Sequence, residues 1–226
     1  MKRMLALLTG IALSGSPLTL AGEATAVSIA TDALDRIHTT AEAHRRIMIV
    51  EVMGRYTGWI ALEAGIAGGA DVILIPEQPF EIEEVCEYIK QRKERGRAFS
   101  IIVVAEGAKP KGGKEIIYGD TVDEFGNIRL GGVAYYLGRE IEDRTDIETR
   151  VVVLGHLQRG GSPTPFDRIL ATRYGIAAID LVQQGKFGLM VALRGNDIVS
   201  VPLKDVAGKR KRVDRKLYEM ATIFFG

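Results

Sequence analysis

The sequence has little cysteine, little histidine and no dominant charge, and each shortage excludes a class of protein. Its 226 residues include one cysteine, Cys86, and three histidines at positions 38, 44 and 156. A single thiol excludes a disulfide framework, and the scattered histidines lack the spacing of metal ligands. The 30 lysines and arginines nearly balance the 29 aspartates and glutamates, so no global field favours nucleic acid or an anionic membrane. Any anion site must therefore be local.

Helix and strand patterns alternate from residue 24 onward. Short apolar runs without polar alternation predict buried strands, and longer runs with apolar residues three or four apart predict helices. This alternation predicts an α/β fold with a parallel sheet covered by helices on both faces. The expected strands are 46–53, 71–77, 99–107, 150–156 and 189–193, and the expected helices are 24–45, 58–69, 79–96 and 164–185.

Three further segments have simple interpretations. Residues 108–131 are rich in glycine and charge, and they predict an exposed hairpin that turns near residues 125–127. The basic run at 209–212 is expected to be a solvated loop rather than a nucleic-acid site. Cys86 lies in a helical pattern and is expected to be a small core residue.

Polar residues and glycines follow three of the expected strands where each strand ends. The carboxyl ends of parallel strands lie at one edge of a sheet, where α/β proteins place ligands. Arginine matches phosphate oxygens with paired hydrogen bonds, and a carboxylate suits sugar hydroxyls, so the pattern predicts a site for a phosphorylated polyol. For any one of these arginines alone, a surface ion pair is the alternative. The residues are Met53, Gly54, Arg55, Glu106, His156 and Arg159.

Two more arginines lie at the opposite ends of two expected strands. Arg46 and Arg150 begin strands that end at the expected site, so they cannot reach the same cleft within one chain. They could reach the cleft of a neighbouring subunit. This placement predicts a homo-oligomer, at least a dimer.

Two long segments resemble the 6-phosphofructokinase family. They are RIMIVEVMGRYTGWIALEAGIAGGAD (46–71) and VVVLGHLQRGGSPTPFDRILATRYG (151–175), and the similarity extends from about Thr25 to the C-terminus. The hairpin at 108–131 is similar to the branch that includes pyrophosphate-dependent and long-type bacterial enzymes.

The resemblance implies fructose 6-phosphate as the ligand and a role for each candidate residue. Met53, Gly54 and Arg55 would line the sugar site, and Glu106 would hold a sugar hydroxyl. The resemblance implies that His156 and Arg159, both in GHLQRGG, would bind the 6-phosphate. It also implies that an adjacent subunit of a dimer or tetramer would contribute Arg46 and Arg150.

The family's phosphoryl-donor motifs are missing from this sequence. The family carries a glycine-rich phosphate loop, a GGDxT-type segment and a TIDND motif whose aspartate is the catalytic base, and none occurs here. The resemblance implies Mg2+ with ATP or pyrophosphate as the donor, but the residues that would bind them or discriminate between them are absent. We therefore expect a phosphofructokinase that keeps the sugar-phosphate site, has no assigned catalytic residue and is inactive alone. The alternative is a non-catalytic sugar-phosphate-binding regulatory protein.

Residues 1–24 have a pattern of their own. A basic start, an apolar run of roughly ten residues and small residues afterwards are typical of a secretory signal. The run is too short to span a bilayer. If the segment is a genuine signal, the protein is an exported binding protein. If the gene is truncated or frame-shifted, the resemblance of residues 1–24 to a signal is fortuitous. We favour the second interpretation and expect a cytoplasmic protein whose functional region is 25–226.

Overall fold

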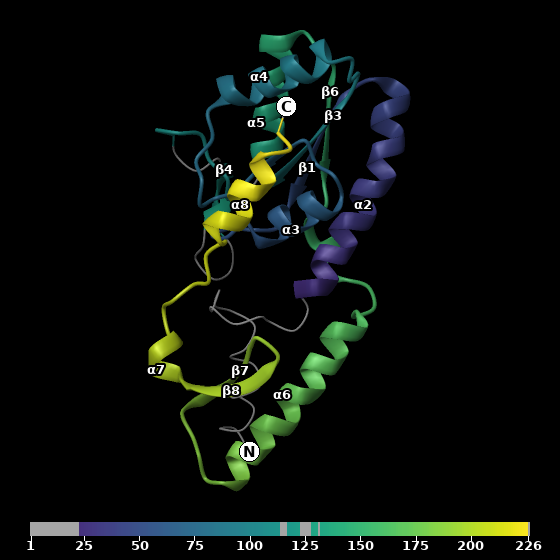
Figure 1. The fold of residues 1–226 in the computed structure, drawn as a ribbon. Helices are drawn as coiled ribbons and strands as arrows, with labels where there is room; N and C mark the ends of the chain where they lie inside the picture. The colour runs from purple at the N-terminus through teal and green to yellow at the C-terminus, as the bar shows by residue number, and fades with distance from the viewer. Residues whose placement is uncertain (1–22, 114–116, 123–127, 131, 226) are drawn as a thin grey trace. The chain divides into compact units, whose positions relative to one another are not determined.

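The computed structural model describes residues 23–113, 117–122, 128–130 and 132–225. The chain divides into two compact units, drawn in Figure 1. The sheet unit comprises residues 26–161 and 213–226, and the hairpin unit comprises residues 1–25 and 162–212.

The sheet unit is built on a four-stranded parallel sheet with the order β2-β3-β1-β6. All six residues of each of the two central strands are buried, as their unbroken apolar runs predicted. The strands are β1 (Ile47–Val52), β2 (Val72–Leu74), β3 (Ser100–Ala105) and β6 (Thr149–Val153).

Helices cover both faces of this sheet, which confirms the predicted architecture (Figure 1). Successive side chains of a strand point to opposite faces, so Val50 packs in one core cluster and Ile49 in the other. Full burial of one such aliphatic side chain stabilises the fold by about 1.5–3 kcal/mol. One face packs against α2 (Glu23–His44), α3 (Trp59–Ala67) and α8 (Arg215–Thr222), and the other against α4 (Ile82–Glu94) and α5 (Val133–Thr145).

The predicted hairpin after β3 is present. Strand β4 (Ile117–Val122) pairs antiparallel with β5 (Ile128–Leu130). The turn expected near residues 125–127 lies outside the described residues, as does the segment 1–22.

The hairpin unit corrects one expectation. The strand expected at 189–193 is β7 (Leu189–Arg194), but it pairs antiparallel with β8 (Asp197–Pro202) instead of joining the parallel sheet. The pairing is local: a two-residue Gly195-Asn196 turn, with Gly195 at φ +59°, reverses the chain and brings β8 back alongside β7. The unit also contains α6 (Pro165–Gln183) and the short α7 (Leu203–Val206).

Helix α6 begins at a well-defined cap. The Thr164 hydroxyl accepts a hydrogen bond from the Asp167 backbone N at 3.3 Å, and Pro165 occupies the first turn. The Asp167 side chain is 3% exposed, and its Oδ2 accepts hydrogen bonds from the Thr25 backbone N at 2.8 Å and from the Thr164 hydroxyl at 3.0 Å. The Thr25 hydroxyl also donates to this oxygen. This carboxylate therefore joins the first turn of α2 to the first turn of α6.

Three smaller expectations can be compared with the structure. Cys86 is a buried core residue, as predicted, and burial raises the pKa of its thiol. The basic run at 209–212 forms a loop, again as predicted. Within the described segments, no helix is both long and apolar enough to cross a membrane.

Candidate functional site

The three loops that follow β1, β3 and β6 leave the sheet at one edge. Val52 is paired with Ala105 across β1 and β3, and Glu51 is paired with Val153 across β1 and β6. The residues after these pairs therefore start side by side at the carboxyl edge. The sequence predicted this arrangement from the strand ends alone.

Hydrogen bonds join the first two loops directly. The Glu106 backbone N donates to the Val52 carbonyl at 2.9 Å, and the Gly54 backbone N donates to Glu106 Oε1 at 3.4 Å. The Gly107 backbone N donates to the Gly54 carbonyl at 3.2 Å. Glu106 thus lies against the Met53-Gly54 turn, and the two loops form one surface.

Two glycines are required for this close approach. Gly54 has a φ of +153°, and a Cβ there would lie 2.7 Å from the Thr57 carbonyl oxygen. A Cβ on Gly107 would lie 1.9 Å from the Arg55 carbonyl oxygen. A side chain at Gly107 would force the two loops apart, and a side chain at Gly54 would distort the β1 loop itself.

The third loop forms a short 3-10 turn, η2 (Gly155–Arg159). One of its residues is buried: Gln158 is only 2% exposed, whereas His156, Leu157 and Arg159 are exposed. Gln158 Oε1 accepts a hydrogen bond from the Met53 backbone N at 3.2 Å, which attaches this turn to the β1 loop. All three loops are therefore connected.

The cationic side chains of the site are available for an anion. Among the described residues, His156 and Arg159 have no hydrogen-bond or ion-pair partner for their side chains. The Arg55 guanidinium carbon lies 5.9 Å from the centre of the Tyr56 ring, a cation–π contact. An imidazole and two guanidiniums in this state can donate several charge-assisted hydrogen bonds to a phosphate.

A buried carboxylate lies directly behind the site, and sequence reasoning missed it. Glu51 is 5% exposed, and its Oε2 accepts a hydrogen bond from the Ala134 backbone N, at the start of α5, at 3.1 Å. Burial raises the pKa of Glu51, the bond from Ala134 partly offsets this, and the nearby charge of Glu106 raises it further. The sequence did contain a signal, because Glu51 is the one charged residue in the strand IMIVEV.

Arg46 and Arg150 lie at the other edge of the sheet, and the structure does not bring them to the three loops. Arg46 precedes β1, and Arg150 pairs with Met48 near the start of β6. Both bind one carboxylate: Arg46 Nε lies 2.6 Å from Glu148 Oε2, and Arg150 forms an ion pair with Oε1 of the same residue.

The described part of the chain contains no group of three or more histidine, cysteine, aspartate or glutamate side chains that could hold a metal ion. At the carboxyl edge, the two described carboxylates, Glu51 and Glu106, each accept a backbone hydrogen bond, from Ala134 and Gly54 respectively. Mg2+ favours several oxygen ligands in octahedral geometry, and these residues do not fit it. No reaction step can be assigned to a metal at this edge.

Comparison with known proteins identifies the family. The sequence profile described as Phosphofructokinase matches residues 13–182. The chain belongs to the phosphofructokinase family. A pyrophosphate--fructose 6-phosphate 1-phosphotransferase of Streptomyces coelicolor is 54% identical over 202 residues, which are 89% of this chain and 59% of the relative. An ATP-dependent 6-phosphofructokinase of Chloroflexus aurantiacus is 57% identical over 201 residues, 89% of this chain and 54% of the relative.

Solved phosphofructokinase structures agree with this assignment. The phosphofructokinase of Saccharomyces cerevisiae superposes with a TM-score of 0.72 at 32% identity, covering 85% of this chain and 24% of that one. A pyrophosphate-dependent phosphofructokinase of Marinobacter aquaeolei has a TM-score of 0.68 at 24% identity, covering 93% of this chain and 57% of that one, and supports the fold.

The chain spans a little more than half the length of the curated relatives described above. Pyrophosphate-dependent and ATP-dependent relatives match it at similar identity, so the overall likeness does not discriminate between the two donors.

Proposed function

We propose that the sheet unit binds fructose 6-phosphate as the acceptor site of a phosphofructokinase. His156 and Arg159 bind the 6-phosphate, the 53–55 turn lines the sugar, and Glu106 accepts a hydrogen bond from a sugar hydroxyl. One observation carries the proposal: two side chains suited to phosphate, without partners in the described chain, lie on a turn that is hydrogen-bonded to the β1 loop. The family assignment supports the same ligand.

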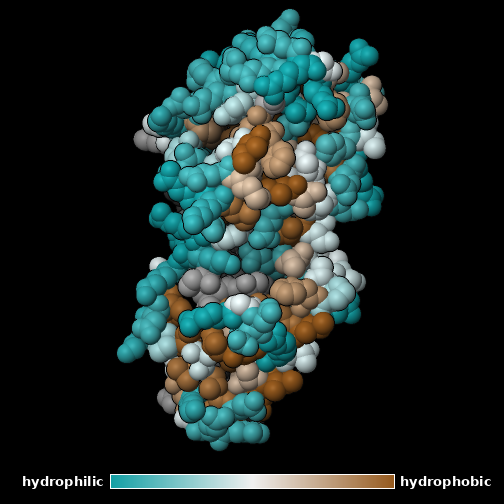
Figure 2. Space-filling view, viewed as in Figure 1, coloured by the Kyte–Doolittle hydropathy of each residue, from teal (hydrophilic) through white to brown (hydrophobic). Residues whose placement is uncertain are grey.

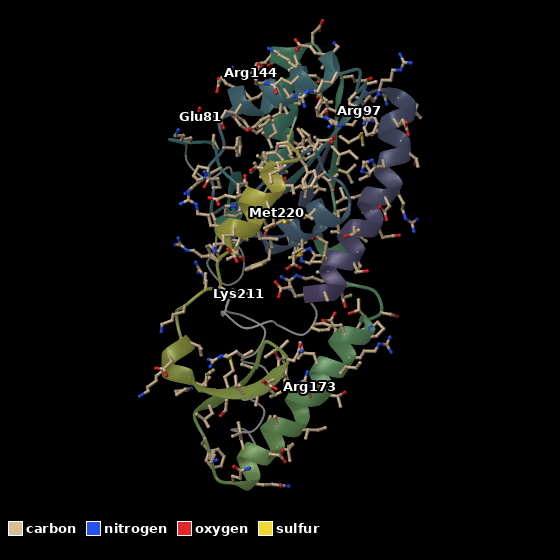
Figure 3. All side chains as sticks on the ribbon, viewed as in Figure 1. Glu81, Arg97, Arg144, Arg173, Lys211 and Met220 are labelled. Carbon is tan, nitrogen blue, oxygen red and sulfur yellow. The ribbon has the colours of Figure 1, made fainter. Side chains whose placement is uncertain are left out.

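Calorimetry with fructose 6-phosphate tests the site. Arg159→Ala should weaken binding roughly tenfold or more, because a hydrogen bond to a charged group contributes about 1.5–3 kcal/mol. Arg173→Ala is the matched control: Arg173, labelled in Figure 3, lies on α6 and donates from Nη2 to the Asn196 carbonyl at 2.6 Å within the hairpin unit. Equal affinity of the wild-type chain for fructose and fructose 6-phosphate would contradict the phosphate assignment.

The proposal includes assembly into a homo-oligomer, a dimer or tetramer. Arg46 and Arg150 are at the amino edge of their own sheet, and we assign them to the phosphate of a neighbouring subunit's site. In the isolated chain, Glu148 neutralises part of their charge. Light scattering alongside the calorimetry should show that affinity falls as dilution produces monomers; a monomer that binds equally tightly would exclude this role.

The proposed activity of the chain alone is binding without phosphoryl transfer. In the family, Mg2+ with ATP or pyrophosphate supplies the phosphoryl group, and this sequence contains neither the donor loop nor TIDND. Loss of a general base alone removes about 10²–10⁴ in rate. A coupled assay should detect no fructose 1,6-bisphosphate with either donor. The missing motifs also favour a second candidate function, a non-catalytic sugar-phosphate-binding regulator. Detectable turnover in this assay would exclude that second function.

The site also bears on where the protein acts. A sugar-phosphate site of the glycolytic type belongs in the cytoplasm, and we assign residues 25–226 to it, with the signal-like pattern of residues 1–24 fortuitous. Residue 13, where the family match starts, already lies within that segment. N-terminal sequencing of the purified protein tests this, because cleavage near residue 22 would indicate export.

A further inference from the structure

Gln158 is the one buried residue of η2, although its neighbours in the turn are open to solvent. Its side chain is 2% exposed, whereas His156 and Arg159 on either side are exposed. A buried amide is costly unless both its donor and its acceptor are used. The position therefore requires partners, and the structure supplies them.

The two partners of Gln158 belong to two different loops of the site. Oε1 accepts from the Met53 backbone N at 3.2 Å, and Nε2 donates to the Gly155 carbonyl at 3.1 Å. One partner is a donor and the other an acceptor, so this amide orientation satisfies both, and the flipped one would satisfy neither. Neither a hydroxyl nor an ionised carboxylate combines the same reach with both functions.

We propose that Gln158 is a positioning residue that fixes the η2 turn relative to Met53. This inference rests on the proposed function: the tether sets the separation between the phosphate-binding side chains of η2 and the sugar-binding turn after β1. Gln158 lies beneath the surface and acts through its neighbours, without contact to the ligand.

The physical consequence is a coupling between two half-sites. When the two half-sites are rigidly connected, a ligand bound to one half also contacts the other half, and no additional entropy is lost in ordering the loops. Without the tether, the sugar half and the phosphate half bind as separate weak sites. The turn itself survives, since Leu157 N donates to the Leu154 carbonyl at 3.1 Å and Gly160 N to the Leu157 carbonyl at 3.1 Å.

The test compares whole and partial ligands on three variants of the full chain. Gln158→Leu removes both hydrogen bonds at similar volume, and Gln158→Glu keeps the acceptor for Met53 but loses the donor to Gly155. Gln183→Leu, at an exposed glutamine of α6, is the control. Calorimetry with fructose 6-phosphate and with inorganic phosphate, and amide hydrogen exchange at Met53, are the readouts.

In Gln158→Leu, fructose 6-phosphate affinity should fall about tenfold, as expected for loss of the one buried hydrogen bond that joins η2 to the β1 loop, while inorganic phosphate affinity changes less than about twofold. The Met53 amide should exchange faster in this variant and stay protected in Gln158→Glu, which should bind with intermediate affinity. The control should match the wild type in every readout.

Three results would overturn the positioning role. The first is unchanged Met53 exchange in Gln158→Leu, which would show that no tether exists. The second is an equal loss of affinity for inorganic phosphate and fructose 6-phosphate, which would place Gln158 in the phosphate half alone. The third is a wild-type chain that does not bind fructose 6-phosphate; this defeats the proposed function first, and Met53 exchange then still shows whether the tether forms.

Discussion

The two units of this chain differ in how they bury apolar surface. In the sheet unit, the central strands are buried along their whole length between helices on both sides. In the hairpin unit, the buried residues of α6 are Asp167, Leu170 and Tyr174, and the other residues of this helix are partly or well exposed. Several large apolar side chains of α6 are exposed, and Figure 2 shows hydrophobic surface along this helix. They are Phe166, Ile169, Ile176 and Ile179.

The contrast shows which unit carries its own stability. The described part of the hairpin unit contains only a two-stranded sheet, α6 and the short α7, and so small a set of elements provides little hydrophobic driving force. The proposed site lies wholly in the sheet unit, on loops supported by a complete core. Its geometry therefore depends on the well-packed part of the chain.

The largest effect is expected from a core substitution in the sheet unit. Ile102, at 0% exposure in the middle of β3, should cost about 2–5 kcal/mol of unfolding free energy when changed to alanine, because a cavity is left. Ile176→Ala, at 61% exposure on α6, should change it by less than about 0.5 kcal/mol. Urea denaturation monitored by the single tryptophan, Trp59 of the sheet unit, measures the first effect, and amide hydrogen exchange within 162–212 measures the second. Similar costs would mean that the α6 face is covered in solution.

A smaller effect should come from the polar contact that holds the hairpin unit together. Asp167 Oδ2 accepts three hydrogen bonds, two from Thr25 and one from Thr164. Asp167→Asn removes the negative charge of this acceptor and should destabilise the hairpin unit by about 1–3 kcal/mol. Amide hydrogen exchange within 162–212 measures it, with Asp180→Asn, at an exposed aspartate of the same helix, as control. Faster exchange spread equally over β1 and β3 would show that the two units do not open separately.

The smallest effect is a pH dependence within the sheet unit. Burial raises the pKa of Glu51 above its ordinary 4.5, so the folded chain binds this proton more tightly than the unfolded chain. The stability from this group is fully present below pH 4.5 and is lost as the pH rises through the raised pKa. Glutamine cannot ionise, so Glu51→Gln should gain stability relative to wild type over that rise. Denaturation between pH 4 and 8 measures the unfolding free energy of each protein, with Glu94→Gln, at an exposed residue, as the control. A difference between Glu51→Gln and wild type that stays constant with pH would contradict the prediction.

Periodicity and strand ends were enough to predict most of the sheet unit from the sequence. The apolar runs predicted β1, β2 and β3, because strands buried on both faces need no polar alternation. Helix α5 was missed although Val133, Leu137 and Ile141 lie four apart, because it follows directly on the glycine-rich hairpin segment. The prediction that β7 joins the parallel sheet was wrong, because the Gly195-Asn196 turn pairs this strand with β8. Its partner β8 and the helices α7 and α8 were also not predicted.

The candidate site shows a similar division. Residues that follow strand ends were predictable, because the edge they share depends only on strand direction. Gln158 and Glu51 were not, since their importance comes from burial against other elements: the β1 loop for Gln158 and the start of α5 for Glu51. A sequence shows that a residue is polar, but the partner that makes it matter is known only once the chain is folded.

The return of the chain to the sheet unit after residue 212 has a consequence for synthesis. The Val213 backbone N donates to Glu77 Oε1 at 3.0 Å, and the Tyr218 hydroxyl donates to the Ile73 carbonyl at 3.2 Å. A ribosome completes all four strands of the parallel sheet before it makes α8, the helix that covers one flank. At about 5–20 residues per second, the roughly sixty residues between the end of β6 and the start of α8 occupy about 3–12 s. During that interval the nascent chain carries a formed sheet with an uncovered apolar flank, which is when a chaperone would bind it.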